Sequence, residues 1–268
     1  MLFVAGLSFS LNCVHAETLA AEKKLVMGFF PLYSTVELYK KYGPLKDYLE
    51  EQLGQTIRLE TAKDFPTFVK RTSERRYDIA ITAPHFGLRA VDQKKYRIIA
   101  THKNSGQQLV LIHKDKNWKT LGALRGKKVG TGFAKALTTR LGKQRLIDYG
   151  ITAEDMPSFT VFKTHNAAVE AIQMGNVDAV ITTINVADKM ISQGKPIKIL
   201  DRGITFPNMP IMVAADQPAS LDVSIQKALL ALNDHESGRS LLTHIGSKGF
   251  RIVDAIDYEM LRPYVPKK

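Results

Sequence analysis

The chain has one cysteine, Cys13, among its 268 residues. A single cysteine cannot form a disulfide framework or a thiolate metal site within the chain, and it leaves almost no room for cysteine catalysis. The seven histidines show no metal-ligand spacing with each other or with carboxylates on one helix face. We therefore expect no bound metal and no cofactor.

The signature motifs of common enzymes are also missing. The sequence has no Gly-x-Ser-x-Gly elbow, no phosphate loop and no His-Glu-x-x-His, and Gly130 and Gly132 lack a third glycine at dinucleotide-binding spacing. An enzyme would need paired titratable groups in a cleft, and no such pair is visible in the sequence. The prediction is a protein that is not an enzyme.

Long hydrophobic runs are absent too. The apolar run from Leu2 to Leu11 is too short to cross a bilayer, and Val14-His15-Ala16 before Glu17 puts small residues where a signal peptidase cleaves. Residues 1–16 are therefore predicted to be a cleaved signal peptide that directs the protein to the periplasm, and the mature chain is not expected to span a membrane. The alternatives are a lipid anchor on Cys13 and a buried N-terminal segment.

Acidic residues are outnumbered, with 26 Asp and Glu against 38 Lys and Arg and a formal net charge of +12. Such a balance favours an anionic ligand, nucleic acid or an anionic membrane surface, or simply keeps the protein soluble. The basic residues are scattered along the chain rather than gathered on one element among aromatics, so nucleic acid is not an expected partner. A nucleic-acid or surface binder would show a steep salt dependence.

What is present is an alternation of short apolar runs and amphipathic stretches, which predicts an α/β fold. The strands are expected at residues 25–30, 56–61, 79–82, 97–101, 108–113, 128–131, 159–163, 179–183, 197–201 and 211–215. The helices are expected at 35–53, with the helical face interrupted at Gly43-Pro44, and at 67–75, 86–93, 137–149, 166–174, 186–193 and 221–233. Each sheet is predicted to be mixed and mostly parallel, with helices on its flanks.

Two polar or Gly/Pro-rich segments, His102–Gly106 and Gly203–Pro210, divide the chain into three blocks. The first and last blocks are small for a domain, so they are predicted to form one lobe together, from residues 17–103 and 209–268. Residues 104–208 are predicted to form the second lobe. Two hinge crossovers would then leave a cleft between the lobes, where small ligands bind.

The starts of helices that follow strands are the candidate ligand sites. Their unpaired backbone amides attract anions, and nearby side chains complete the shell. Hydroxyl and amide side chains at these positions also act as ordinary helix caps, which is the alternative interpretation of each one. The candidate binding residues are Tyr33, Ser34, Thr35, His85, Phe86, Thr138, Thr139, His165, Thr183 and Asn185.

Many short motifs follow one another in a characteristic order and spacing after residue 16. They are Tyr42-Gly43-Pro44-Leu45, Asp64-Phe65, Tyr77-Asp78-Ile79-Ala80 with Pro84, Leu124-Arg125-Gly126-Lys127-Lys128-Val129, His165 with Ala168, Gly175-Asn176-Val177-Asp178-Ala179, Gly238-Arg239, Gly249-Phe250 and Asp257-Tyr258. Their order and spacing resemble those of the periplasmic substrate-binding proteins of phosphate, phosphite and phosphonate ABC importers, and the resemblance covers essentially the whole chain after residue 16.

This resemblance implies a type II periplasmic-binding fold and an anionic phosphonyl-like group held between the lobes. It points to His165, to His85 or Phe86, and to Tyr33 with Ser34. Family members usually carry a Pro-x-Ser-x-Ser-Gly type loop that grips the anion. Here Ala136 stands where the first serine would be, and Thr138 keeps the second hydroxyl. The departure implies a weaker grip or a different ligand.

Together these features predict a monomeric periplasmic solute-binding protein. It would capture a small phosphonate-, phosphite- or phosphate-like anion by hinge closure and deliver it to the permease of an ABC importer. One alternative is a ligand-sensing partner of a membrane sensor kinase, and another is a binder of a different organic solute.

Overall fold

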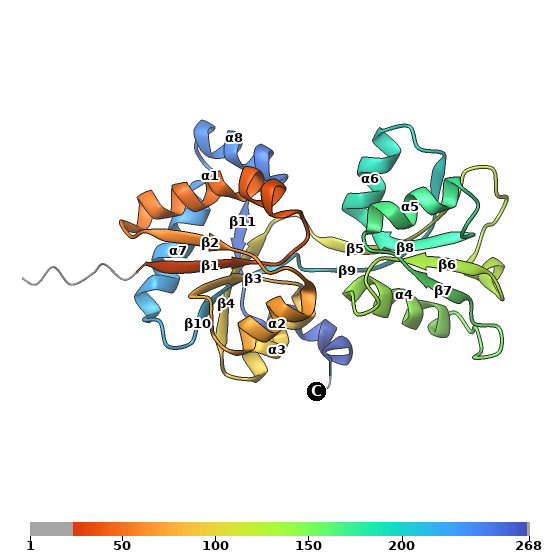
Figure 1. Ribbon diagram of the computed structural model, residues 1–268, viewed down its shortest axis with the longest axis horizontal. Helices are drawn as coiled ribbons and strands as arrows, with labels where there is room; N and C mark the ends of the chain where they lie inside the picture. Colours follow the sequence, from red (N-terminus) through yellow and green to blue (C-terminus); the bar gives the residue numbers. More distant parts are fainter. Residues whose placement is uncertain (1–23, 267–268) are drawn as a thin grey trace, which may run out of the picture.

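The computed structural model describes residues 24–266 and shows two lobes side by side along the long axis of the molecule (Figure 1). Lobe 1 holds both described chain ends, and the chain passes into lobe 2 and back again. The predicted signal peptide, residues 1–16, lies outside the described residues.

Lobe 1 is built on a six-stranded sheet with the order β11-β4-β10-β3-β1-β2. Helices α1 and α8 lie on one side of this sheet and α2 and α3 on the other (Figure 1). The strands are β1 (Leu25–Phe29), β2 (Ile57–Glu60), β3 (Ile79–Ile81), β4 (Tyr96–His102), β10 (Pro210–Ala214) and β11 (Phe250–Ile252). The helices are α1 (Thr35–Leu53), α2 (Phe65–Ser73), α3 (Pro84–Asp92), α7 (Ala219–Ala231), α8 (Glu236–Ile245) and the 3₁₀ helix η2 (Ala255–Tyr264).

Lobe 2 is built on a five-stranded sheet with the order β7-β6-β8-β5-β9. Helices α5 and α6 lie on one side and α4 on the other (Figure 1). The strands are β5 (Gly106–His113), β6 (Lys128–Thr131), β7 (Ser158–Val161), β8 (Ala179–Thr183) and β9 (Ile197–Phe206). The helices are α4 (Leu137–Asp148), α5 (His165–Gln173), α6 (Ile184–Ser192) and the 3₁₀ helix η1 (Leu121–Leu124).

Both sheets are mixed, as predicted, but parallel pairs are not the majority. Among the described strands, four pairs are parallel and five are antiparallel. The antiparallel pairs all involve β4, β5, β9, β10 or β11. In lobe 1, β10 and β11 run against β1 and β3, and in lobe 2, β5 runs against β6 and β8. Strands β4 and β9 have the direction of the β-α-β strands but pair only with these reversed strands. Local patterning shows where a strand is but not its direction, which is why the sequence overestimated the parallel share.

The second crossing is shorter than predicted. The expected segment Gly203–Pro210 is strand up to Phe206, because β9 continues to pair with β5 there, with Gly106 opposite Phe206 and Gln107 opposite Thr205. The two crossings lie side by side, and the Asn208 side-chain amide donates to the backbone carbonyl of Asn104 (3.1 Å). Long-range pairing overrides the glycine and proline signals in this segment.

Helix α1 runs through Gly43-Pro44 without the expected interruption. Proline has no N–H, so the carbonyl four residues earlier, that of Lys40, loses its helical partner. The ring Nε2–H of His244 donates to this carbonyl (2.8 Å) from helix α8. A tertiary contact thus compensates for the missing helical bond, and α1 stays continuous.

The three last elements, α8, β11 and η2, were not predicted from the sequence. Strand β11 is only three residues long, and the side chain of Asn233 bonds both the N–H (2.9 Å) and the carbonyl (3.0 Å) of Phe250. η2 buries Tyr258, whose hydroxyl donates to the carbonyl of Asn208 at the second crossing (2.9 Å). Elements this short carry little periodicity of their own.

The hydrophobic core is divided by the sheets. In lobe 2, one cluster lies under α5 and α6 and another under α4 and η1. The core of lobe 1 contains two residues from lobe 2, Leu137 and Leu141 of α4, which are 5% and 3% exposed. The two lobes therefore share apolar contact in this structure.

Within residues 24–266, no helix combines the length and the apolar character that crossing a membrane requires.

Candidate functional site

Two helices start between the lobes without a side-chain cap. Among α1–α6, four helices begin with Ser, Asp or Thr side chains that accept a hydrogen bond from the first-turn backbone, whereas α3 begins after Ala83 and α4 after Ala136. Alanine offers no capping oxygen, so the first amides of α4 remain available to an external acceptor. In α3 the first residue is Pro84, which has no N–H, and the Phe86 N–H donates to the Ala83 carbonyl (3.0 Å), so His85 supplies the one available amide of that turn. The sequence therefore departs from normal capping at these two ends.

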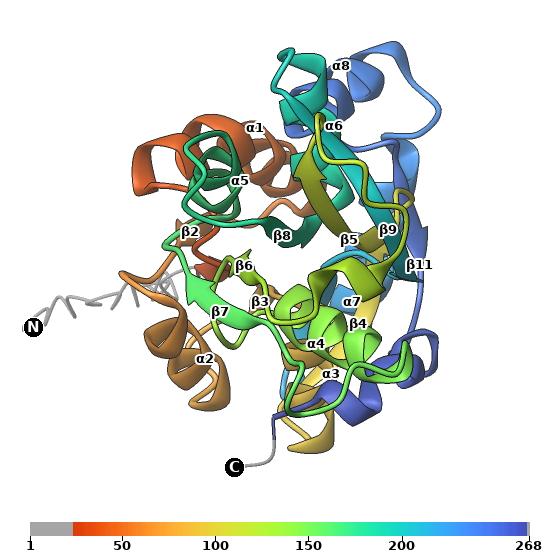
Figure 2. The ribbon, with the colours of Figure 1, turned by 90° about the vertical axis from the view of Figure 1, so that its right-hand side faces the viewer.

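The two uncapped ends face each other across the lobes. The ring Nε2 of His85, on α3, lies 3.3 Å from the backbone carbonyl oxygen of Lys135, just before α4. Figure 1 shows α3 and α4 on facing sides of the two lobes, and Figure 2, looking along the long axis, shows α4 in front of α3. The starts of two helices from different lobes thus meet at one place.

Buried polar groups without partners gather near these helix starts. The Nδ1 atom of His85 and the Oγ1 atom of Thr138 are shielded from solvent and have no hydrogen-bond partner among the described residues. His85 is 0% exposed and Thr138 is 4% exposed. Leaving a buried polar atom unpaired costs about 1–3 kcal/mol, so these atoms indicate places where a ligand would supply the bond.

More unpartnered atoms come from lobe 2. They are the Oγ1 atom of Thr182 at the end of β8, the Nδ1 atom of His165 at the start of α5, and the Nε atom of Arg140 on α4. The C-terminal ends of β6, β7 and β8 and the starts of α4, α5 and α6 lie at the same edge of the lobe 2 sheet, because β6 is parallel to both β7 and β8.

Gln108 is the most unusual of these groups. Both its Oε1 and Nε2 atoms are buried and without a partner, and the residue is 1% exposed. It lies on β5 opposite Thr183, at the strand end nearest the first crossing. Gly203 makes room for it, since a Cβ at position 203 would lie 1.9 Å from Oε1. A fully buried amide with neither end bonded is rare, and it adds to the unpartnered set at this edge.

His165 packs on the chain that follows β6. A Cβ added to Gly132 would lie 2.8 Å from the His165 ring, so the glycine permits this close approach. The ring is therefore held at the start of α5 with its Nδ1 atom unpartnered. We infer that Gly132 is a positioning residue for His165.

Burial sets the protonation of both site histidines. The pKa of His85 falls from 6.5 to about 3, mainly because of burial; the backbone contact to Lys135 opposes this shift and the positive charge of Arg140 adds to it. Burial alone lowers the pKa of His165 to about 4. Both rings are neutral at pH 7, so each has one N–H donor and one acceptor nitrogen.

The buried histidines predict a loss of stability in acid. His102, buried in lobe 1, also has its pKa lowered to about 4 by burial. Each pKa is lower in the folded state, so the unfolded chain takes up protons first as the pH falls below about 6.5. Stability should fall toward pH 4, by about 2 kcal/mol per histidine at pH 5. Urea unfolding from pH 7.5 to 4.5 measures this. His102→Gln should reduce the slope by about a third, and an equal slope in this variant would contradict the assignment.

The predicted residues at the start of α1 are exposed, and one of them caps the helix. Ser34 forms a capping box with Glu37, in which its hydroxyl donates to the carboxylate (2.7 Å) and accepts from the Glu37 N–H (3.3 Å). Thr35 is exposed, and Tyr33 is 37% exposed with the Lys41 ammonium 5.2 Å from its ring centre. The structure does not bring these three residues to the buried group around His85.

The remaining predicted residues divide between capping and packing. Thr183 caps α6 through the Val186 N–H (3.5 Å), and Asn185 is exposed. The Thr139 hydroxyl donates to the Phe133 carbonyl (3.0 Å), and Phe86 is buried with its ring 4.1 Å from that of His85. The capping alternative thus applies to Ser34 and Thr183, while His85, Thr138 and His165 carry unpartnered atoms.

Sequence reasoning missed Gln108, Thr182 and Arg140 as binding candidates. A signal existed for Gln108, because alternate residues of a strand point to the same face of the sheet. Gln108 is therefore on the same face as Val110 and Ile112, whose side chains are buried under α4. A polar residue on the buried face of a strand points to a site at the strand end. Arg140 gave no such signal, because helix arginines are usually solvated.

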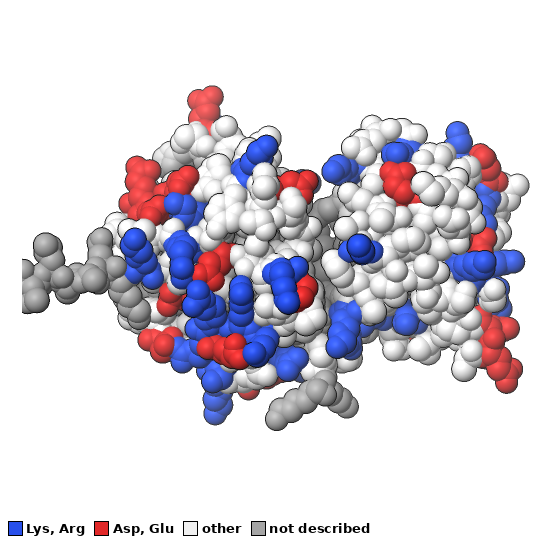
Figure 3. Space-filling model, viewed as in Figure 1, with Lys and Arg blue, Asp and Glu red and all other residues white. Residues whose placement is uncertain are grey.

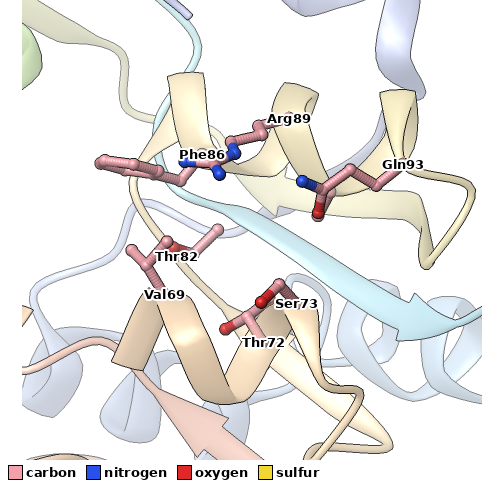
Figure 4. A pocket seen from close by; sticks show the side chains of 8 residues that line it. Val69, Thr72, Ser73, Thr82, Phe86, Arg89 and Gln93 are labelled. Atoms are coloured by element: carbon pink, nitrogen blue, oxygen red, sulfur yellow. The ribbon is translucent and has the colours of Figure 1, made fainter. Parts of the chain in front are cut away.

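The hollows described on lobe 1 are not lined by unpartnered buried polar atoms, although Phe86 lines one of them. One lies between α2 and α3 and has room for about one water molecule, with a volume of about 10 Å³. Its lining comprises Val69, Thr72, Ser73, Thr82, Phe86, Arg89, Ala90 and Gln93 (Figure 4). A larger groove of about 520 Å³ runs along β4, α7 and β11, where Arg97 and Asp222 form a two-point ion pair. None of its lining side chains has an unpartnered buried atom.

The Lys and Arg side chains that give the protein its positive charge lie at the surface and not in the core. Figure 3 shows Lys and Arg on both lobes, with Asp and Glu among them on each, and a crease between the lobes. No Asp, Glu, Lys or Arg is buried among residues 24–266. In the same range, no group of three His, Cys, Asp or Glu side chains could hold a metal ion. Neutral donors, helix starts and the partly exposed Arg140 therefore define the chemistry of the site.

Solved structures share this architecture. PhnD1 from Prochlorococcus marinus, in complex with methylphosphonate, is 14% identical with a TM-score of 0.79 and covers 91% of this chain and 97% of its own. A binding protein component of an ABC phosphonate transporter from Pseudomonas aeruginosa is 14% identical with a TM-score of 0.75, covering 91% and 85%. A Xanthomonas citri protein bound to ATP is 14% identical with a TM-score of 0.74, covering 91% and 99%.

These likenesses identify the fold as that of the type II periplasmic binding proteins. The family model described as "ABC transporter, phosphonate, periplasmic substrate-binding protein" matches residues 27–258. The chain belongs to this family, so the resemblance found in the sequence is confirmed.

Proposed function

We propose that this protein captures a small phosphonate-, phosphite- or phosphate-like anion between its lobes and delivers it to the permease of an ABC importer. The observation that carries the proposal is the meeting of two uncapped helix starts, one from each lobe, beside buried polar atoms without partners. Family membership supports import rather than the sensing alternative. It also supports a periplasmic location.

The head group of the ligand would be held mainly by donors. The first amides of α4, the Thr138 hydroxyl and the Arg140 guanidinium lie on lobe 2, and the His85 backbone N–H in the first turn of α3 lies on lobe 1. Helix starts and Arg favour anions, and hydrogen bonds to a charged acceptor are worth about 1.5–3 kcal/mol each. The lost serine at Ala136 is offset by the backbone amides, which need no side chain.

His85 would contribute differently, because its Nε2–H points to the Lys135 carbonyl. In the neutral ring this leaves Nδ1 as an acceptor. A phosphonate that carries one proton has a P–OH group, which can donate to Nδ1. The site therefore suits a singly protonated anion with several acceptor oxygens and one donor.

A ligand held this way would contact both lobes and favour their closure. His85 belongs to lobe 1, whereas Thr138 and Arg140 belong to lobe 2, so binding energy is gained fully only when the lobes are together. The two adjacent crossings are the hinge in this proposal.

The purified protein tests the proposal by titration with methylphosphonate, phosphite, phosphate and sulfate in a thermal-shift assay and by calorimetry. A ligand that binds only the folded state raises the melting temperature. We expect a phosphonyl anion to do so, and His85→Ala to weaken binding at least tenfold. His235→Ala, at an exposed position, is the matched control. No shift with any phosphorus anion, or equal affinity in His85→Ala, would contradict the proposed site.

A further inference from the structure

Aromatic rings from both lobes meet beside the proposed head-group site. Phe65 starts α2 in lobe 1, and Phe133 follows β6 in lobe 2. Their ring centres are 6.1 Å apart and the rings are stacked at 30°. The Phe65 ring also meets Phe86 edge-on at 4.8 Å and Phe30 at 4.5 Å. Phe65 and Phe133 are only partly buried, so this aromatic cluster keeps a face that is not covered by protein.

The aromatic cluster is tied to the head-group residues by short contacts. Phe86 follows His85, and their rings are 4.1 Å apart. The Phe133 carbonyl accepts from the Thr139 hydroxyl (3.0 Å) and from the Ala136 N–H (2.9 Å), so the loop that carries Phe133 closes onto the start of α4. If the organic substituent of a bound phosphonate extends from the head group toward this side, it contacts the phenyl rings of the aromatic cluster.

No carboxylate is buried in this environment, and no Asp or Glu is buried anywhere among residues 24–266. Glu37 and Asp64 start helices in lobe 1, but both are exposed and serve as caps. The hydrogen bonds from Ser34 lower the pKa of Glu37, and those from Thr67 lower the pKa of Asp64. A ligand ammonium group would leave water here without gaining a buried negative partner, which is unfavourable.

We propose that this protein selects phosphonates whose organic substituent is uncharged and apolar, an alkyl or aryl group, over phosphonates that carry an amino group. Phe65, Phe86 and Phe133 pack on the substituent, and the helix starts hold the phosphonyl head. This inference rests on the proposed function. Burial of each methylene in such a subsite raises affinity about fourfold, and aromatic walls favour flat or extended apolar groups.

Propylphosphonate and 2-aminoethylphosphonate test the proposal directly, because they have nearly the same shape and differ by a methyl against an ammonium group. Calorimetry with the purified protein should give propylphosphonate at least tenfold tighter binding than 2-aminoethylphosphonate, and tighter binding than methylphosphonate. Equal or tighter binding of 2-aminoethylphosphonate would overturn the proposed selectivity. In that case, binding of methylphosphonate would still support the proposed function. Failure of all three to bind would overturn both.

Variants separate an apolar subsite from a simple contact between lobes. Phe133→Ala should reduce the ratio of propylphosphonate to methylphosphonate affinity to within about twofold, and Phe133→Leu should retain most of it. Tyr149→Ala, an exposed aromatic on lobe 2, should leave the ratio unchanged. If Phe133→Ala weakens both ligands by the same factor, the ring acts only in closure and the proposal is wrong. The wild-type comparison stands even if a variant fails to fold.

Discussion

Thr138→Asp is expected to abolish anion binding, with a loss of more than 100-fold in affinity. Thr138 is the second residue of α4, and its buried hydroxyl has no partner. A carboxylate at this position would take the free amides of the helix start for itself and repel the ligand. Like charges in close contact cost several kcal/mol, and 1.4 kcal/mol corresponds to a factor of ten.

The substitution is also expected to lower the stability of the folded state, because Thr138 is 4% exposed and a buried carboxylate loses its hydration, although an acidic side chain in the first turn of a helix offsets part of this cost. Thr120→Asp is the matched control. It adds the same charge to lobe 2 at an exposed position before η1, at the opposite end of β6 from the site. Calorimetric titration and the melting temperature of both variants decide the matter. Retained affinity in Thr138→Asp would remove the start of α4 from the site.

Leu137→Ala is expected to lower ligand affinity by about 30-fold with little change in the stability of each lobe. Leu137 comes from lobe 2 but is buried in the apolar cluster of lobe 1. This contact exists only when the lobes are together, so its loss acts on closure. Truncation of a buried leucine to alanine costs about 2 kcal/mol or more, which corresponds to the stated factor.

Affinity and shape must be measured together to test this coupling. Ile147→Ala is the control, since Ile147 lies on the same helix but is 52% exposed. Small-angle scattering with and without methylphosphonate would report whether the variant closes less fully at a given ligand concentration. Wild-type affinity in Leu137→Ala would mean that apolar contact between the lobes does not contribute to binding.

The order of strands and helices could be predicted from the sequence because it depends on local periodicity. Short apolar runs mark β4 and β5, and helix α1 spans Thr35–Leu53, as expected. Strand direction, the length of β9 and the continuity of α1 at Pro44 could not be predicted. Each depends on a partner distant in sequence, such as β5 for β9 or His244 for the Lys40 carbonyl.

The candidate site was predicted in part for the same reason. Histidine and threonine at strand–helix junctions drew attention to His85, Thr138 and His165. Whether a hydroxyl is a cap or a ligand depends on whether its hydrogen bonds are already used, and that is a property of the folded chain. Ser34 uses its hydroxyl within α1, whereas the hydroxyl of Thr138 has no partner.

The sequence by itself determined the α/β class, the alternation of elements and the family, because these reside in local patterns and in the spacing of short motifs. Only the tertiary structure decided that α3 and α4 begin without caps at the same place and that Phe65 lies against Phe133. These residues are separated by about 50 positions or more in the chain. Their proximity follows from the packing of two lobes, which no local pattern encodes.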